Sequence, residues 1–445
     1  MIKKKALALK KDNEELLSCG GNALIGQTLC RHVQATLPEN FQIRRRDAIG
    51  DRDILMTMIG LLANGRSDFI DVELYRDDFV FLHSFGIERL PSEPTLRQRL
   101  DQYAPGCTHA ALRKLNQSLL KARSLGTVQV QGDDFIPVDI DVSPLDNSGS
   151  NKQGIGFTYK KHDGFAPIFA YIGTEGYMLD HELRPGSQHC QQDTPAFIKS
   201  CIKQIQTLQL GKPCLIRMDS GNDAEENFAH LKDHAFIIKR NMRREKPEQW
   251  LALARRVGVG VPKPDTREGK NVYTGFTDHF CPGGVKSTTG PVSIAFEVIE
   301  RLYDPEGNRL LIAEIEVNTF WTNLTCDASE VIRLYHAHGT SEQFHSELKS
   351  DMGVEQLPSG KFCVNQLVLL CAMVSFNALR TIGQEVIQRA HLAPIKIQVS
   401  RWRLKTVLQN IIHCPVRVIR HARSIGLHFG RRCPWFTLIE NMSHA

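Results

Sequence analysis

Three acidic side chains occupy positions from which they could share divalent cations. Asp141 and Asp219 each lie at or near the end of a predicted strand, and Glu342 lies on a predicted helix. Carboxylates that are brought together repel and raise one another's pKa unless a cation neutralises them. Mg²⁺ prefers oxygen ligands, and a pair of such ions activates the attacking oxygen and stabilises the leaving oxygen in phosphodiester chemistry. The trio therefore predicts a site for metal-dependent phosphoryl transfer.

The first of these acids has a close competitor. In the segment FIPVDIDV, apolar residues alternate with Asp139 and Asp141, which predicts a strand with both carboxylates on one face. We favour Asp141 because a D-x-S pattern begins with it, and Asp139 is the alternative. The segment PCLIRMDSGND predicts a buried strand that ends on Asp219. Open α/β sheets usually place their sites at such strand ends.

The third acid lies in the polar segment YHAHGTSEQFHSELKS, residues 335–350. If Thr340 caps a helix, Glu342, His345 and Lys349 fall within roughly 60° of one another, because positions i, i+3 and i+7 share a face. Such a row would place a lysine beside the third acid. The alternative interpretation is a solvated amphipathic helix without chemistry.

The other face of that helix is predicted to be apolar, with Phe344 and Leu348 buried. Glu347 lies outside the polar row and is a minor competitor to Glu342 as the third acid. Gly339 is expected to interrupt the helix, so that residues 335–338 come from the turn before it.

The elements that must position the three acids follow from the hydrophobic pattern. Residues 1–125 are predicted to be mostly helical. Residues 126–240 predict three meandering strands followed by helix, strand, helix and strand, which is an α/β sheet. Residues 241–322 predict a mainly β insertion around a DPEGN turn, residues 323–385 carry the third acid, and residues 386–445 form a basic segment.

Basic residues are concentrated in a few places, although the formal net charge is only +6. Between Lys396 and Arg432 there are nine Lys and Arg residues, including Arg401 and Arg403, and no Asp or Glu. Such a block predicts a polyanionic partner, most simply nucleic acid. A basic surface that only keeps the protein soluble is the alternative.

Short predicted helices near the start of the chain also carry arginines. The segment PSEPTLRQRLDQYA has a capping signal at Ser92 and places Arg97 and Arg99 beside apolar positions, and Arg44–Arg46 form a second basic spot. Helices of this kind could form a helix-turn-helix unit that reads a DNA groove. Plain packing of the helices against one another is the alternative.

The bulk composition is that of an ordinary soluble protein. The chain has 445 residues, of which 42% are hydrophobic and 23% charged. Its first residues lack the apolar core of a signal peptide, and the longest apolar run, Leu367–Val374, is too short to span a bilayer and predicts a buried helix. Twelve cysteines include no C-x-x-C pair, so neither a zinc site nor a disulfide framework is predicted. We therefore expect a cytoplasmic protein without membrane contact.

These motifs together resemble a known family. Tyr335, His338, Glu342 and Lys349 match the spacing Y-x2-R-x3-E-x6-K of the transposases that share the YREK signature, with histidine at the arginine position. With the segments DIDVSPLDNSGSNKQG, RMDSGND and GTSEQFHSELKSDMG, the chain most resembles DDE transposases of bacterial insertion sequences, in particular the insertion sequence 1380 family. The resemblance covers nearly the whole chain. It implies a ribonuclease-H-like core interrupted by a β insertion, with an N-terminal helical DNA-binding region.

The resemblance also implies a function. It is cut-and-paste transposition, by DNA strand cleavage and strand transfer at terminal inverted repeats, carried out by a homodimer on double-stranded DNA. Asp141, Asp219 and Glu342 would be the catalytic, metal-binding triad and hold two Mg²⁺ ions, for which Mn²⁺ can substitute. Tyr335 and Lys349 would contact phosphates near the cleaved end. The protein would be cytoplasmic and associated with the nucleoid when bound.

Two further residues have expected roles on DNA. His338 is shorter than arginine and mostly neutral at pH 7, so it could donate one hydrogen bond to a phosphate but could not form a bidentate clamp; the change could also mark a decayed copy. In related transposases an aromatic residue of the insertion stacks on a flipped base, a role that would fall to Trp321 unless it is a buried core residue. The rival functions are a structure-selective nuclease and a DNA-binding repressor that has lost its chemistry.

Overall fold

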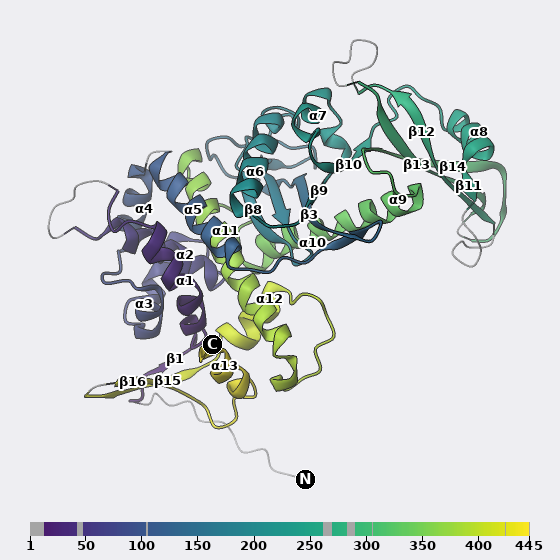
Figure 1. Cartoon of the computed structure of the whole chain (residues 1–445). Coiled ribbons are helices and arrows are strands. Elements are labelled where there is room, and N and C mark those ends of the chain that lie inside the picture. The colour runs from purple at the N-terminus through teal and green to yellow at the C-terminus, as the bar shows by residue number, and fades with distance from the viewer. Residues whose placement is uncertain are drawn as a thin grey trace, which may run out of the picture.

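The computed structural model describes residues 13–41, 48–103, 106–260, 269–282, 290–304, 306–422 and 424–444 (Figure 1). Arg44–Arg46, which sequence analysis treated as a basic spot, lie outside these described residues. Mixed helices and strands confirm the α/β class that the hydrophobic pattern predicts.

A ten-stranded sheet carries the elements that position the acids. Five of its strands lie side by side in the order β8 (Tyr177–Glu182), β7 (Ile168–Ile172), β3 (Asp133–Val142), β9 (Cys214–Met218) and β10 (Ala235–Arg240). β8, β7 and β3 form an antiparallel meander, whereas β3, β9 and β10 run parallel. A short strand, β2 (Val128–Val130), pairs with the first part of β3.

Two helices connect the meander to the parallel strands. α6 (Thr194–Leu208) joins β8 to β9, and α7 (Glu225–Leu231) joins β9 to β10. The predicted order of three strands, helix, strand, helix and strand is therefore confirmed. α6 buries one apolar face at helical spacing, formed by Phe197, Ile198, Cys201, Ile205 and Leu208. That face belongs to the same hydrophobic core as the apolar side chains of β3 and β9.

The region after β10 extends the same sheet. It comprises α8 (Pro247–Val257), β11 (Val259–Gly260), β12 (Lys270–Phe280), β13 (Val292–Tyr303) and β14 (Arg309–Thr322). β13 and β14 form an antiparallel hairpin, and β14 pairs with β10. In Figure 1 these strands project away from the helical part of the molecule. The strands on both sides of the DPEGN turn agree with the sequence pattern, whereas α8 was not predicted.

The N-terminal helices pack around one long helix, α11 (Phe362–Gln388). They are α1 (Asn22–Thr36), α2 (Asp51–Ala63), α3 (Phe79–Phe85), α4 (Glu93–Gln102) and α5 (Cys107–Lys121), with a 3-10 helix at Phe69–Tyr75. One hydrophobic core joins residues of these helices to α11 and to the C-terminal helices α12 (Leu404–Val407) and α13 (Phe436–Ser443). The N-terminal helical region and the C-terminal segment therefore share a core.

α11 is the predicted buried helix around Leu367–Val374. Within the described part of the chain it is the one helix whose length and composition would allow it to cross a membrane. However, 83% of its most apolar stretch is buried inside the protein, as expected for a core helix. Its apolar residues are covered by the surrounding helices, so the prediction of a buried helix is confirmed.

Two small sheets complete the fold. β1 (Leu16–Leu17) pairs with β15 (Val416–His421), which pairs with β16 (Ser424–Phe429), so that Leu17 lies opposite Val416. The second small sheet lies between β3 and β7 in the chain and consists of β4 (Leu145–Asp146), β6 (Asp163–Phe165) and β5 (Gly156–Phe157).

Candidate active site

The third acid is carried by a continuous helical stretch. This stretch consists of α9 (Ala328–His336), a 3-10 turn (Ala337–Thr340), α10 (Ser341–Ser346) and a π-helical turn (Glu347–Asp351). As expected, the α-helix is interrupted at Gly339, which lies with His338 in the 3-10 turn between α9 and α10, whereas Tyr335 lies in α9. Thr340 does not cap α10 with its side chain; its hydroxyl donates to the carbonyl oxygen of Ala337 at 2.9 Å.

A pocket of about 710 Å³ lies between this stretch and the ends of β3 and β9. All three predicted acids line it, together with the polar row of the helix. The predicted residues that line the pocket are Asp141, Asp219, Tyr335, His338, Glu342, His345 and Lys349. Phe344 and Leu348 are buried on the opposite face. The predicted division of the helix into a polar and an apolar face is therefore confirmed.

Strand pairing explains how the two aspartates come to one pocket. β3 and β9 run parallel, with Asp139 opposite Arg217. Side chains repeat on one face every second residue, so the next residues on that face are Asp141 and Asp219. Asp219 directly follows the last residue of β9 and begins a 3-10 turn. The two acids thus lie at neighbouring strand ends.

The two aspartates influence each other's ionisation. Burial and the negative charge of Asp141 raise the pKa of Asp219 to about 6, and hydrogen bonds from the Gly221 amide and Asn222 only partly oppose this. Burial also raises the pKa of Asp141, but the hydrogen bond and charge of His345 outweigh it and hold that pKa below its ordinary value. A divalent cation between such carboxylates would relieve their repulsion.

Glu342 is the least constrained of the three acids. Its side chain is exposed in the first turn of α10, and within the described residues it makes no hydrogen bond or ion pair. Nowhere in the described ranges do three His, Cys, Asp or Glu side chains lie close enough together to hold a metal ion as they stand. The acids therefore share a pocket without converging as a ligand set. Their oxygen atoms nevertheless have the chemistry that Mg²⁺ and Mn²⁺ require.

Two side chains of the polar row contact the β3 side of the pocket. His345 is buried, with Nδ1 3.3 Å from the Tyr171 hydroxyl and Nε2 3.2 Å from Oδ2 of Asp141. The helical spacing predicted His345 in the polar row without a role, and in the structure its side chain contacts and orients Asp141. Lys349 donates to the carbonyl oxygen of Pro144 at 2.5 Å, and burial lowers its pKa.

Aromatic side chains form another part of the wall. The ring of Tyr335 packs on Phe320 with centroids 4.6 Å apart, and burial with the charge of Asp219 raises the pKa of its hydroxyl, which stays protonated. Tyr159 and Lys160, between β5 and β6, also line the pocket, and sequence analysis missed them. The available signal was the run FTYKKHDG, in which an aromatic residue is followed by paired lysines.

Asp139 is not equivalent to Asp141. It is only 3% exposed, and both of its oxygens accept hydrogen bonds from Arg217, at 2.7 and 2.8 Å. Nδ1 of His338 lies 2.8 Å from Oδ1 of Asp139. Asp139 is thus fully engaged, whereas Asp141 faces the pocket. His338 is buried against Asp139 through its Nδ1, so that a hydrogen bond to a phosphate, which stays a prediction, would have to come from Nε2.

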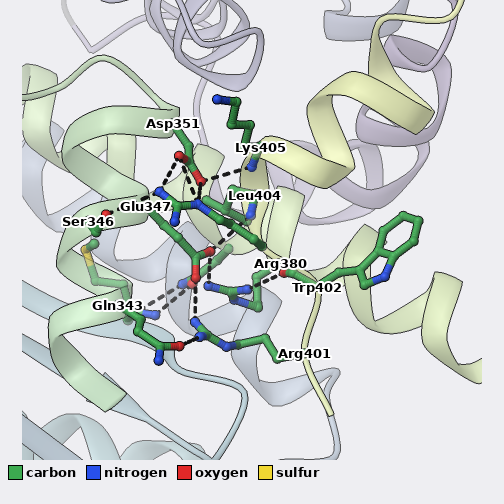
Figure 2. Close-up of polar contacts among 12 residues, drawn as sticks. Gln343, Ser346, Glu347, Asp351, Arg380, Arg401, Trp402, Leu404 and Lys405 are labelled. Carbon is green, nitrogen blue, oxygen red and sulfur yellow. Dashed lines mark hydrogen bonds and ion pairs between the residues drawn. The ribbon is translucent and has the colours of Figure 1, made fainter. Parts of the chain in front are cut away.

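Glu347 is buried in a separate cluster of charged side chains, where arginines compensate its charge (Figure 2). It is 1% exposed and accepts hydrogen bonds from Arg380 at 2.7 Å, from Arg401 at 2.5 Å and from the amide of Leu404 at 3.1 Å. These contacts leave no room for a metal ion. Glu347 is therefore not a candidate for the third acid.

The basic segment is partly turned inward. Arg401 was expected to bind DNA, but its guanidinium is bound by Glu347 and by Gln343 at 2.6 Å (Figure 2). The guanidinium also lies over the ring of Phe344. Burial lowers the pKa of Arg401 to about 10. Arg403 keeps half of its side chain exposed but forms a bidentate ion pair with Asp351. Arg401 is thus a structural residue, and Arg403 stays a prediction for DNA contact.

The two arginines of α4 also differ. Ser92 caps this helix as predicted, accepting from the amide of Thr95. Arg99 is buried, forms an ion pair with Asp51 and donates to the carbonyl oxygen of Ile49 at 2.7 Å, so the expectation that it reads DNA is wrong. Arg97 is exposed and pairs with a glutamate one turn earlier.

Trp321 is a core residue. It is 3% exposed, and its Nε1 donates to Oδ1 of Asp223 at 2.9 Å. The guanidinium of Arg240 lies 5.2 Å from its ring centroid, and the ring of Phe228 packs edge-on at 5.9 Å. Its faces are occupied, so the expectation that Trp321 stacks on a flipped base is not supported in this conformation.

An α/β sheet with three acids and a lysine at one pocket is a fold and site suited to phosphoryl transfer. Residues 1–245 and 298–445 match the family model described as transposase DDE domain group 1. The chain therefore belongs to this family of DDE transposases. The family is one of DNA transposases, which cleave DNA and transfer strands and generally use divalent metal ions.

Comparison with individual proteins adds little to the family assignment. No curated protein matches the chain. Among solved structures, a piggyBac transposase synaptic complex with hairpin DNA is similar at 12% sequence identity. The similarity covers 88% of this chain and 76% of that chain, with a TM-score of 0.39. The family model omits residues 246–297, which comprise all of α8 together with β11, β12 and the first half of β13.

Proposed function

We propose that this protein is a cut-and-paste transposase of an insertion sequence, in which Asp141, Asp219 and Glu342 bind two Mg²⁺ ions. One observation carries the proposal: acids from three separate elements, β3, the end of β9 and α10, line one pocket. The competing acids on the same elements, Asp139 and Glu347, are instead paired with arginines. Among the described residues, none of the three pocket acids pairs with an arginine or a lysine, which supports a role for them in binding an external cation.

The order of strands supports a ribonuclease-H-like core. Three antiparallel strands are followed by two parallel strands, and helices make the connections. The first aspartate then comes from the central strand and the second from the end of its parallel neighbour. The sheet-extending region β11–β14 enters the chain before the third acid, as the resemblance to insertion-sequence transposases implies.

The chain's own groups suit a DNA end. When bound, the ions would activate the attacking oxygen and stabilise the leaving oxygen. Lys349 and Lys160 place positive charge beside the acids, and the protonated hydroxyl of Tyr335 can donate to a phosphate oxygen. Water would nick one strand, and the freed 3′-hydroxyl would attack the opposite strand, which closes the end into a hairpin. A second water would open the hairpin, and the regenerated 3′-hydroxyl would attack the target DNA. Each step exchanges one phosphodiester oxygen for another and needs no external energy source.

The proposed partners are double-stranded DNA, as terminal inverted repeats and as target, and a second copy of the chain. Two DNA ends must be processed together, which is the reason for expecting a homodimer. Membership of the insertion sequence 1380 family rests on the motifs around the three acids. A cytoplasmic location, with association to the nucleoid when bound, follows from the same proposal.

The test is cleavage of labelled DNA that carries the element's terminal repeats, with Mg²⁺ or Mn²⁺. Glu342→Gln and Asp141→Asn are compared with Glu226→Gln, which changes an exposed acid in α7, outside the pocket lining. Site-specific nicking and strand transfer in the parent and in Glu226→Gln, but in neither pocket variant, are expected. Hydrolysis without strand transfer would favour a nuclease instead, and binding without cleavage would favour a repressor.

A further inference from the structure

A second set of side chains joins the three elements that carry the pocket acids. Each of these side chains precedes one of the acids by two or four residues. Asp139 precedes Asp141 by two residues on β3, and Arg217 precedes Asp219 by two residues on β9. His338 precedes Glu342 by four residues, which is about one helical turn. Each acid-bearing element therefore contributes one member to a buried layer beneath the pocket.

Direct contacts join the members of this layer. Asp139 lies opposite Arg217 in the strand pairing, and the two form a bidentate ion pair with bonds of 2.7 and 2.8 Å. The remaining guanidinium nitrogen donates to the carbonyl oxygen of Leu334 in α9 at 2.8 Å, and His338 lies 2.8 Å from the carboxylate. Arg217 thus contacts both β3 and the helical stretch.

Burial makes these contacts specific. The side chains of Arg217 and Asp139 are each 4% exposed, and that of His338 is 7% exposed. The desolvation cost of a buried ion pair offsets much of its Coulombic attraction. The pair still defines geometry, because displacing one partner leaves the other as an uncompensated buried charge. A fork of two parallel hydrogen bonds also fixes the angle between donor and acceptor.

We propose that Arg217, Asp139 and His338 form a positioning cluster that fixes where Asp141, Asp219 and Glu342 lie relative to one another. The proposal rests on the proposed function, since it concerns the same pocket. None of the three members needs to touch DNA or metal. The cluster fixes the relative positions of β3, β9 and the α9–α10 stretch. The acids lie two to four residues further along these elements, so their relative positions are fixed as well.

The cluster also explains the histidine at the signature position. Oδ1 of Asp139 accepts from both Arg217 and His338, and the imidazole fills this buried position with a single contact. An arginine at position 338 would be longer and would bring a second permanent cation beside the buried guanidinium of Arg217. Histidine fits because it needs only one hydrogen bond. Restoring the family arginine, His338→Arg, is therefore expected to lower cleavage rather than raise it.

The experiment compares Arg217→Lys, His338→Leu and His338→Asn in the full chain. Lysine keeps the charge but cannot form the fork to Asp139 together with the bond to Leu334. Asparagine keeps a donor near the position of Nδ1, whereas leucine does not. The matched control is Arg333→Lys, because Arg333 lies in α9 with 63% of its side chain exposed and makes only a loose contact with Glu330.

Rates are measured at saturating DNA as a function of Mg²⁺ concentration. We expect Arg217→Lys and His338→Leu to lose about 10- to 100-fold in cleavage rate and to need more Mg²⁺, as typical for groups that orient metal ligands. Their affinity for the DNA end should stay within about twofold of the parent, a separation that general destabilisation would not give. His338→Asn should recover most of the loss.

A second readout separates failure of the cluster from failure of the proposed function. Backbone amide exchange is followed in residues 334–342 and 214–219, which the cluster holds together. Faster exchange there in Arg217→Lys, but not in Arg333→Lys, is expected whatever the substrate. If the parent cleaves no end DNA, the proposed function fails and the cluster is judged by exchange alone. The proposal is overturned if the backbone amides of Arg217→Lys exchange at the parental rate. It is also overturned if this variant cleaves at the parental rate with the parental Mg²⁺ requirement.

Discussion

Two glutamates five residues apart, on one helical stretch, have opposite surroundings. Glu342 is exposed to the pocket and has no partner among the described residues, whereas Glu347 is buried and bound by two arginines and a backbone amide. The charge of Glu347 is compensated by Arg380 and Arg401, whereas Glu342 has no ion-pair partner among the described residues. The contrast teaches that one residue type can occupy two kinds of surroundings: the charge of Glu347 is satisfied within the chain, whereas the charge of Glu342, which we propose binds a metal ion, has no internal partner.

The largest expected effects come from replacing either of the two glutamates by glutamine. Glu347→Gln removes the charge that compensates Arg380 and Arg401, and we expect it to lower the free energy of unfolding by about 3–5 kcal/mol. Glu342→Gln should change that free energy by less than about 0.5 kcal/mol while lowering cleavage more than about 100-fold. Urea unfolding and cleavage assays on both variants give the comparison. A stable but inactive Glu347→Gln protein would break it.

Trp321 extends the comparison to the sheet. As a core residue it should behave like Glu347, so Trp321→Ala should cost about 3–5 kcal/mol in the free energy of unfolding. Trp321→Phe keeps most of the ring but loses the hydrogen bond to Asp223, which should cost about 1 kcal/mol. Thermal unfolding measures both. A normal unfolding temperature for Trp321→Ala, with a defect confined to processing of DNA ends, would instead favour stacking on a base.

Asp219 gives a smaller effect with a defined pH dependence. Its pKa is about 6 in the folded protein, above the ordinary value of 3.8, so the folded state binds the proton more tightly than the unfolded state. Between pH 3.8 and 6 the free energy of unfolding therefore falls as pH rises, and ionised Asp219 destabilises the protein at pH 7.

The variant Asp219→Asn removes that penalty. Its Oδ1 can still accept from Gly221 and Asn222, so we expect unfolding at pH 7 to cost about 1–3 kcal/mol more than in the parent, with cleavage lost. The gain should fade as pH drops from 6 to 4, where the parent is protonated too. Unfolding curves over this pH range, without added metal ions, are the measurement. A gain that persists unchanged at pH 4 would contradict an ionised Asp219 as its cause.

The smallest effects are expected at exposed arginines. Arg97→Ala and Arg403→Ala each break a surface ion pair, so the free energy of unfolding should fall by no more than about 1 kcal/mol. Loss of a phosphate contact would instead appear as weaker DNA binding with a shallower dependence on salt. Binding measured at several salt concentrations separates the two roles. Arg99→Ala is the contrasting variant, because its buried partner Asp51 would lose its charge compensation.

Local pattern predicted much of the site. Alternation in FIPVDIDV and the apolar run ending at Asp219 gave the strands, and helical spacing placed Glu342, His345 and Lys349 on one face. These inferences succeed because side-chain direction depends on neighbours two to seven residues away. The D-x-S pattern also favoured Asp141 over Asp139, and Asp141 is the one of the two that lines the pocket.

Partners that are distant in sequence could not be predicted in this way. Whether an arginine is exposed depends on where its partner folds, and Arg401 meets Glu347 only because the C-terminal segment packs on the helix. The same holds for Arg99 with Asp51. Composition indicates the number of charges but not which of them are already neutralised.

Contacts between the two ends of the chain, in the core around α11 and in the pairing of Leu17 with Val416, affect how the protein folds during synthesis. The core around α11 needs helices from both sides of the sequence, so α1–α5 leave the ribosome long before the helix that covers them. Until α11 and α12 are synthesised, their apolar faces have no native partner and are exposed to misassembly and aggregation. Folding is therefore a late, long-range event, and an interrupted chain that ends before residue 362 would lack the scaffold for its own first hundred residues.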